Sequence, residues 1–478
     1  MCDTDESNRR ATSISMLPDD VLLDIFDFYR KIRHVHNYYV WRWHVLVRVC
    51  RRWRYIIFAS PLRLNLQILC TDASPVRKSL GIWPPYPIVL DSFIYSEHND
   101  GDNVAAALEH FDRVCAVSLL GIGSRLGKFV TLMQEQYPAL ICLRITSTNG
   151  TAPVLPPKFL GGSAPCLQEI ALSAIPYPAL PTLLLSASGL VSLRLRKIPP
   201  TGYISPETMV ACLAALPRLK TLIIEFQSTW PHPEQIRPPP VARTVLHSLI
   251  FFQFRGASEY LEDLIAEIDS PQVNQIEISY LNQFVDFQVP QLSQFIDYSM
   301  SPRLNRLGRA DVSIYSDRAT FTLYHYAGWD HRHPVRITIS CESAYRQVFR
   351  MAQVLSQFSA TLSTVIRLEL EARFEGDNQL EDTDDLDWLH LLLRFPATQV
   401  VCVSVKLAGF VALALENIAG EMVDEVPVLP NLDLICLENQ PASSVEKFVA
   451  VRRLSGRQLT VVGTQSEFIE RLESYIGK

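Results

Sequence analysis

The chain of 478 residues has no long hydrophobic run, no paired cysteines and no strong excess of either charge. No apolar run approaches the roughly 20 residues that cross a bilayer, and the polar, acidic first ten residues do not resemble a signal peptide. The ten cysteines stand singly without a CxxC pair, which favours reduced thiols and a cytoplasmic or nuclear protein. A net charge of −6 gives no general reason to expect nucleic acid. We therefore expect neither a membrane nor a nucleic-acid partner.

The motifs of common enzymes are also missing, including the P-loop, the HExxH helix and the nucleophile elbow. Gly121-Ile-Gly123-Ser-Arg-Leu-Gly127 joins an expected strand to an expected helix, as a dinucleotide site does, but its GxGxxxG spacing fits a plain turn better. His331 and His333 lack a second ligand cluster at zinc-site spacing. We predict no catalytic residue, no metal ligand and no cofactor.

Apolar side chains are dense in residues 15–60, where we expect helices. Behind Pro18, a good first-turn residue, a helix is predicted from the spacing of Val21, Leu22, Ile25, Phe26 and Tyr29. A second helix, ended by Ser60-Pro61, is predicted to carry two stripes, namely Trp43, Leu46, Val47, Cys50, Trp53 and Ile57, and Val45, Val49 and Ile56. A segment of about 50 residues buries only a marginal core. The second stripe therefore packs on the rest of the chain or on a partner, and both alternatives describe a docking module.

Two segments have unusual charge. Residues 30–54 hold eight Lys or Arg, three His and no acid, interleaved with aromatic residues. Nucleic acid, an acidic protein partner and a solvated surface all fit this pattern, and we favour the protein partner. Residues 371–387 hold eight acids and one Arg, which is typical of a solvated loop.

Beyond residue 110 a unit with apolar residues at i, i+3 and i+5 recurs, and its first seven instances start 23 to 29 residues apart. The instances are Val114/Val117/Leu119, Leu140/Leu143/Ile145, Leu167/Ile170/Leu172, Leu190/Leu193/Leu195, Leu219/Leu222/Ile224, Leu246/Leu249/Phe251, Val273/Ile276/Ile278, Val365/Leu368/Leu370, Val400/Val403/Val405 and Leu432/Ile435/Leu437. This period resembles leucine-rich repeats, in which each unit adds one strand to a solenoid. The usual Asn position holds other residues, and residues 282–360 interrupt the pattern with strands near 312–315, 321–324 and 335–339 and a helix near 343–358. We expect an irregular α/β solenoid.

The N-terminal segment resembles an F-box. The residues that carry the resemblance are Leu17-Pro18-Asp-Asp-Val21-Leu22-Leu-Asp-Ile25-Phe26 and, after a connection longer than the usual one, Val47-Arg-Val49-Cys50-Arg51-Arg52-Trp53-Arg54. Later segments such as Leu429-Pro-Asn-Leu432 resemble the large F-box families of mushroom-forming fungi. The resemblance implies a non-catalytic substrate-receptor subunit of a Skp–cullin–F-box ubiquitin ligase. Its partners would be a small acidic Skp-type adaptor, cullin through that adaptor, and an unknown protein substrate.

The expected fold is α+β overall, with a small all-α F-box followed by an irregular leucine-rich-repeat-like solenoid. The expected boundaries are a disordered N-terminus at 1–12, the F-box at 13–61, a linker or cap region at 62–110 and the solenoid at 111–478. The resemblance assigns adaptor binding to Leu17, Pro18, Val21, Leu22, Ile25, Phe26, Leu46, Val49, Cys50 and Trp53. With the adaptor absent, Leu22, Ile25 and Phe26 are predicted to be partly exposed or loosely ordered.

Substrate binding is predicted at strand positions that alternate with the apolar ones, namely Arg144, Glu169, Arg194, Arg196, Glu225 and Glu277. Mixed charge there suits a protein partner. The alternative function is a repeat-protein interaction scaffold without a ubiquitin-ligase role.

Overall fold

The computed structural model describes residues 14–30, 43–73, 75–94, 101–148, 152–228, 243–281, 288–300, 307–325, 334–340, 344–374, 385–421 and 428–476. It is a mixed α/β structure whose strands are mostly parallel. The chain forms two compact units, one of residues 1–151 and 158–166 and one of residues 152–157 and 167–478. Among the described residues, no helix combines the length and the apolar character needed to span a membrane. The predicted features at 1–12, within 31–42, at 326–333 and within 375–384 lie outside the described residues.

The first unit begins with four short helices, η1 (Ile14–Met16), α1 (Asp19–Arg30), α2 (Trp43–Leu46) and α3 (Arg51–Ala59). Pro18 accepts the first helical hydrogen bond, from Leu22 N, and two acids in the first turn favour the positive end of the α1 dipole. The single helix predicted between residues 43 and 57 is wrong. The backbone of Cys50 is extended, and its Sγ accepts a hydrogen bond from Trp53 N at 3.4 Å, so Cys50 is the N-cap of a new helix.

The rest of the first unit alternates strands and helices, namely β1 (Ile68–Cys70), α4 (Val76–Ile82), β2 (Ile88–Ile94), α5 (Asp102–Leu108), β3 (Val114–Gly121), α6 (Gly123–Leu132), β4 (Cys142–Ser147) and η2 (Phe159–Gly162). The four strands pair in parallel and in chain order, with Leu90, Val117 and Leu143 in register. The region from 62 to 110 thus contributes two strands to this sheet. The glycine motif forms the turn between β3 and α6.

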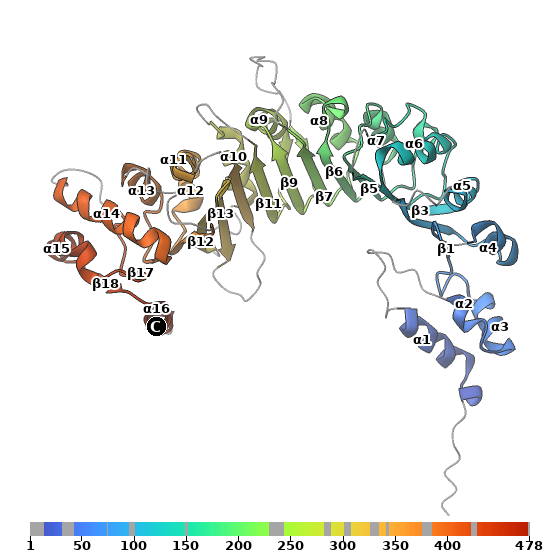
Figure 1. Cartoon of the computed structure of the whole chain (residues 1–478), viewed down its shortest axis with the longest axis horizontal. Coiled ribbons are helices and arrows are strands. Elements are labelled where there is room, and N and C mark those ends of the chain that lie inside the picture. Colours follow the sequence, from blue (N-terminus) through green and yellow to red (C-terminus); the bar gives the residue numbers. More distant parts are fainter. Residues whose placement is uncertain are drawn as a thin grey trace, which may run out of the picture. The chain divides into compact units, whose positions relative to one another are not determined.

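The second unit starts with the same alternation, and its helices lie along one face of the strands (Figure 1). The elements are β5 (Glu169–Ser173), α7 (Leu180–Ser186), β6 (Ser192–Ile198), η3 (Pro200–Gly202), α8 (Pro206–Ala214), β7 (Thr221–Phe226), β9 (Phe251–Gly256), α9 (Ser258–Ala266) and β11 (Gln275–Tyr280). The strands β8 (Thr244–Val245) and β10 (Ile268–Asp269) form a separate pair. Strands β5, β6, β7, β9 and β11 pair in parallel. Except in β9, the predicted apolar residues of these strands are buried, because they point to the face that these helices cover.

Two of the predicted triplets are in the wrong register. In β9, Phe252 is opposite Leu222 and Ile276, so the buried triplet is Leu249/Phe252/Phe254, and Phe251 points to the other face. In β16 (Val400–Val403) the buried triplet is Thr398/Val401/Val403, while Val405 opens the next helix and is exposed. In both strands apolar residues occupy consecutive positions, so the alternation that defines the faces is ambiguous in the sequence.

A three-stranded insertion interrupts the parallel order, as the sequence predicts for residues 282–360. After α10 (Pro290–Met300) come β12 (Leu307–Ile314), β13 (Arg318–His325), β14 (Val335–Ser340), α11 (Ala344–Leu355), α12 (Ser359–Leu362) and β15 (Arg367–Ala372). The strands lie in the order β11-β14-β13-β12-β15, and β13 is antiparallel to both of its neighbours. The insertion therefore places β12 beside β15 in parallel.

The second unit ends with α13 (Asp385–Leu392), β16, α14 (Val405–Glu421), β17 (Leu434–Leu437), η5 (Ala442–Val445), α15 (Glu446–Leu454), β18 (Thr460–Val462) and α16 (Gln465–Ile476). The last helix differs from the others. Its Phe468 packs with Val400, Leu434 and Val462, which alternate with the strand residues that face α14. At β16, β17 and β18, helix α16 therefore covers the sheet face opposite the one on which the other helices lie. We call this opposite face of the sheet the open face of the second unit.

Candidate protein-interaction surfaces

An apolar stripe on α1 is exposed. Val21, Ile25 and Phe28 follow one another at helical spacing and have 40%, 40% and 70% of their surface exposed. We call these three residues the α1 stripe. Val45 and Val49, in and after α2, are exposed to 44% and 57%. Apolar side chains so placed are typical of a surface that another molecule covers.

The opposite side of α1 is packed. Leu22 and Phe26 are fully buried, and the Phe26 ring meets the Trp53 ring edge to face at a centroid distance of 4.9 Å. Two ion pairs link α1 to the following segments, with Arg52 Nη2 at 2.5 Å from Asp19 Oδ1 and Arg63 Nη2 at 2.6 Å from Asp24 Oδ1. The prediction that Leu22 and Phe26 are partly exposed is wrong, because α3 supplies their packing partners. For Ile25 the same prediction is confirmed.

The ten residues that the resemblance assigns to adaptor binding thus fall into two groups. Leu22, Phe26 and Leu46 are buried and hold the helices together, while Leu17 and Trp53 are half-buried. Pro18, Val21, Ile25, Val49 and Cys50 are exposed. Phe28 was not among the predicted adaptor residues, although it follows Ile25 by three residues and shares its helix face.

An aromatic cluster attaches α2 and α3 to the first strands. Trp43 is buried, its Nε1 donates to Gln67 O at 2.7 Å, and its ring meets those of Trp83 and Tyr86 at 5.0 Å and 5.7 Å. Partial burial raises the pKa of Tyr86. These contacts give the helices a fixed base, which reduces the entropy lost when a partner binds.

The predicted substrate-binding residues lie on strands at positions that alternate with the buried ones. Arg144 is on β4 of the first unit, opposite Ser118. In the second unit, Arg196 and Glu225 come together, with Nε and Oε1 3.6 Å apart, and Gln253 Nε2 donates to Glu225 Oε1 at 3.0 Å.

The other three predicted residues lie on β5, β6 and β11. Arg194 Nε donates to Ser192 Oγ at 3.1 Å, and Gln275 Nε2 donates to Glu277 Oε1 at 2.9 Å. Glu169 is in register with Ser192. The result is a row of hydrogen-bonding groups of both charge signs.

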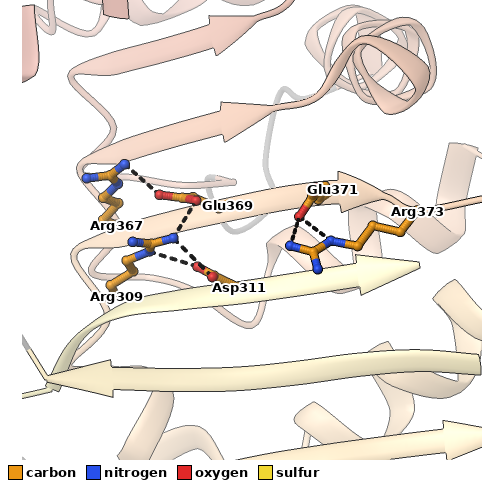
Figure 2. Close-up of polar contacts among 6 residues, drawn as sticks. All are labelled: Arg309, Asp311, Arg367, Glu369, Glu371 and Arg373. Atoms are coloured by element: carbon orange, nitrogen blue, oxygen red, sulfur yellow. Dashed lines mark hydrogen bonds and ion pairs between the residues drawn. The ribbon is translucent and has the colours of Figure 1, made fainter. Parts of the chain in front are cut away.

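A denser polar network lies further along the open face, on β12 and β15 (Figure 2). Arg309 is at its centre, with Nη2 at 2.7 Å from Glu369 Oε2 and Nε at 2.9 Å from Asp311 Oδ1. Arg367 Nη2 lies 2.6 Å from Glu369 Oε1. We call these four residues the β12–β15 network. A separate ion pair joins Glu371 of β15 to Arg373, the first residue after that strand, with Oε2 and Nη2 2.7 Å apart.

Burial affects the charges of this network. Desolvation raises the pKa of the Asp311 carboxyl, and the nearby Glu369 charge raises it further, against the hydrogen bond from Arg309. The Arg309 guanidinium lies 5.1 Å from the Tyr324 ring centroid, and burial, which would lower its pKa, is outweighed by Glu369 and Asp311. The Arg309 side chain is still 40% exposed, so the network is accessible from solvent.

This network was not predicted from the sequence, because β12 lies outside the regular spacing of the repeats. A weak signal exists in the alternation of Arg309, Ala310, Asp311 and Val312, which is typical of a strand with one polar face. In the described part of the chain, no cluster of three or more His, Cys, Asp or Glu residues is arranged to hold a metal ion.

Comparison with known proteins gives no assignment. No protein-family model matches the chain, and no curated protein is significantly similar to it.

Proposed function

We propose that the chain is the substrate-receptor subunit of a Skp–cullin–F-box ubiquitin ligase, with an F-box at its N-terminus and an irregular leucine-rich-repeat-like solenoid behind it. The observation that carries the proposal is the exposed α1 stripe. It lies within the segment whose residues resemble an F-box, on helices whose other side is fully packed. In this proposal the Skp-type adaptor covers the stripe.

The size of the stripe supports a binding role. Complete burial of a Val, Ile or Phe side chain contributes roughly 1.5 to 3 kcal/mol. The α1 stripe together with Val45 and Val49 therefore offers several kcal/mol to a partner, which is a large share of the roughly 8 kcal/mol of a micromolar complex.

Charge supports an acidic partner on this side of the molecule. Arg48 and Arg51, which flank Val49 and Cys50, are exposed, as is Arg54 on the next turn. A Skp-type adaptor is acidic, so its approach would be favoured by these guanidinium groups. Rim charges of this kind act mainly on the association rate, while the apolar residues determine the lifetime of the complex.

The proposed substrate site is the open face of the second unit. Its paired charges of both signs, including Arg196 with Glu225 and the β12–β15 network, fit a protein surface better than a phosphate backbone. The receptor would act without chemistry of its own, by holding the substrate at a high effective concentration near the ubiquitin-charged enzyme.

Binding of a purified Skp-type adaptor tests the first half of the proposal. The double variant Ile25→Asp plus Val49→Asp places two carboxylates on exposed positions, so the fold is retained while the apolar contact is lost. We expect adaptor capture to fall at least 100-fold with an unchanged circular dichroism spectrum. The matched control is Leu185→Asp on α7, because Leu185 is 59% exposed, close to the 57% of Val49, but lies in the second unit.

Capture that survives the double variant, or that is lost equally in Leu185→Asp, would contradict adaptor binding by α1 and α2. A reconstituted ligase then separates a receptor from an interaction scaffold. A receptor supports ubiquitin transfer to a protein bound at the open face, whereas a scaffold binds that protein without transfer.

A further inference from the structure

Two cysteines face each other across neighbouring strands near the end of the second unit. Cys402 on β16 is in direct register with Cys436 on β17, so both side chains point to the same face. Cys436 is fully buried and Cys402 is half-buried. Both are free thiols in this structure.

The register brings the two residues within reach of a disulfide. Neighbouring strands lie about 4.8 Å apart, and the Cα atoms of disulfide-bonded residues are about 4.4 to 6.8 Å apart. The Cβ atoms of directly opposed strand residues have to approach by about 1 Å to reach the separation of about 3.8 Å in a disulfide. Such a bond carries some strain, and a strained disulfide is reduced more readily than a relaxed one.

The surroundings favour reaction between these two sulfurs over reaction with other groups. Cys436 is enclosed by apolar side chains, including Leu434 of β17, Val462 of β18 and Phe468 of α16. Its Sγ donates only a long hydrogen bond to Thr464 O, at 3.8 Å. A hydrogen bond from the Cys402 thiol lowers the pKa of Cys436 and raises that of Cys402, so Cys436 is the thiol of the pair that loses its proton more readily.

We propose that Cys402 and Cys436 form a reversible thiol switch, oxidised to an intramolecular disulfide by a peroxide. One thiol loses its proton and its sulfur attacks the peroxide, so that an S–O bond forms, the O–O bond breaks and water leaves. The second sulfur then displaces the oxygen as the S–S bond forms, and a second water leaves. Two thiols and one hydrogen peroxide thus give one disulfide and two waters.

The cysteine pair lies beside the β12–β15 network. Glu369 of the β12–β15 network is in register with Cys402, so the strand that changes covalently is the neighbour of the network. If the open face binds the substrate as proposed above, oxidation occurs at the edge of that site. The disulfide itself does not depend on the proposed function.

The test uses the full reduced chain, treated with hydrogen peroxide, alkylated and digested without reducing agent. We expect mass spectrometry to detect a peptide that joins Cys402 to Cys436, with a mass two hydrogens below the sum of the two thiol peptides, and recovery of both thiols after dithiothreitol. Cys402→Ser should abolish the joined peptide and leave Cys436 as a thiol or a singly oxidised residue.

Two internal controls make the result decisive. Cys166 is exposed, so its oxidation shows that the reagent was active. Cys115 and Cys142 are buried on neighbouring strands, but Cys142 is opposite Ala116, and we expect this pair to stay unlinked. The proposal is overturned if Cys166 is oxidised while Cys402 and Cys436 still alkylate separately, or if their link forms only in denaturant.

Discussion

Glu262 is predicted to make the stability of the second unit depend on pH. Its carboxylate lies on α9 and accepts two backbone hydrogen bonds from the first turn of α10, with Oε2 at 2.7 Å from Gln291 N and Oε1 at 3.0 Å from Leu292 N. Burial raises the pKa of Glu262 to about 7, although the two backbone hydrogen bonds act in the opposite direction. The perturbation that tests this is Glu262→Gln, which removes the charge and keeps an acceptor oxygen.

The direction in which the unfolding free energy changes with pH follows from proton binding by Glu262. At pH values below about 4.5, the usual pKa of the group, Glu262 is protonated in both the folded and the unfolded chain, and the buried carboxyl carries no penalty. As the pH rises from about 4.5 to about 7, Glu262 ionises in the unfolded chain while it stays protonated in the folded chain. The unfolding free energy therefore falls over this range, and the contribution of the protonated carboxyl is lost once the pH has passed about 7. The difference between the two pKa values corresponds to about 3 kcal/mol as an upper bound.

Urea unfolding between pH 5 and pH 8 measures the effect. We expect the unfolding free energy of Glu262→Gln to exceed that of the natural chain increasingly as the pH rises, after subtraction of the change seen in the exposed control Glu470→Gln. Equal pH slopes in the natural chain and Glu262→Gln would refute the reasoning. A variant that is less stable at every pH by the same amount would instead assign Glu262 only the role of a helix cap.

Two further predictions concern packing in the first unit. Phe26→Ala removes a fully buried ring from its contact with Trp53 and should cost about 3 to 5 kcal/mol in urea unfolding, whereas a loss below 1 kcal/mol would mean that α1 does not pack on α3. Gly101→Ala should destabilise by about 1 to 3 kcal/mol, because Gly101 has φ of 71° and an added Cβ would lie 2.4 Å from the Phe129 ring. The matched change Gly81→Ala, in a helix with open space at that position, should be neutral or stabilising, and equal effects of the two would contradict this explanation.

The parts of the fold that follow from local pattern were predictable. The spacing behind Pro18 gives α1, and most of the apolar triplets give buried strand positions in the correct register. The pattern fails at β9 and β16, where apolar residues occur on both strand faces. In β16 the reason is physical, since α16 covers the open face there and Val400 is buried against Phe468.

Long-range placement was not predictable from the sequence. The break at Cys50 depends on one extended residue within an otherwise helical pattern. The β12–β15 network depends on an insertion that folds in reverse spatial order and brings Arg309 beside Glu369, 60 residues away. Leu22 and Phe26 have the same hydrophobic character as Ile25, and only the position of α3 decides which of them is buried.

The most direct test of the central claim is amide hydrogen–deuterium exchange of the full chain with and without a purified Skp-type adaptor. Adaptor binding at the α1 stripe predicts slower exchange in residues 19–30 and 43–59, with exchange in β5 to β11 unchanged. It also predicts that Ile25→Asp removes this protection. Protection confined to the second unit, or no protection at adaptor concentrations that saturate a known F-box protein, would contradict the account.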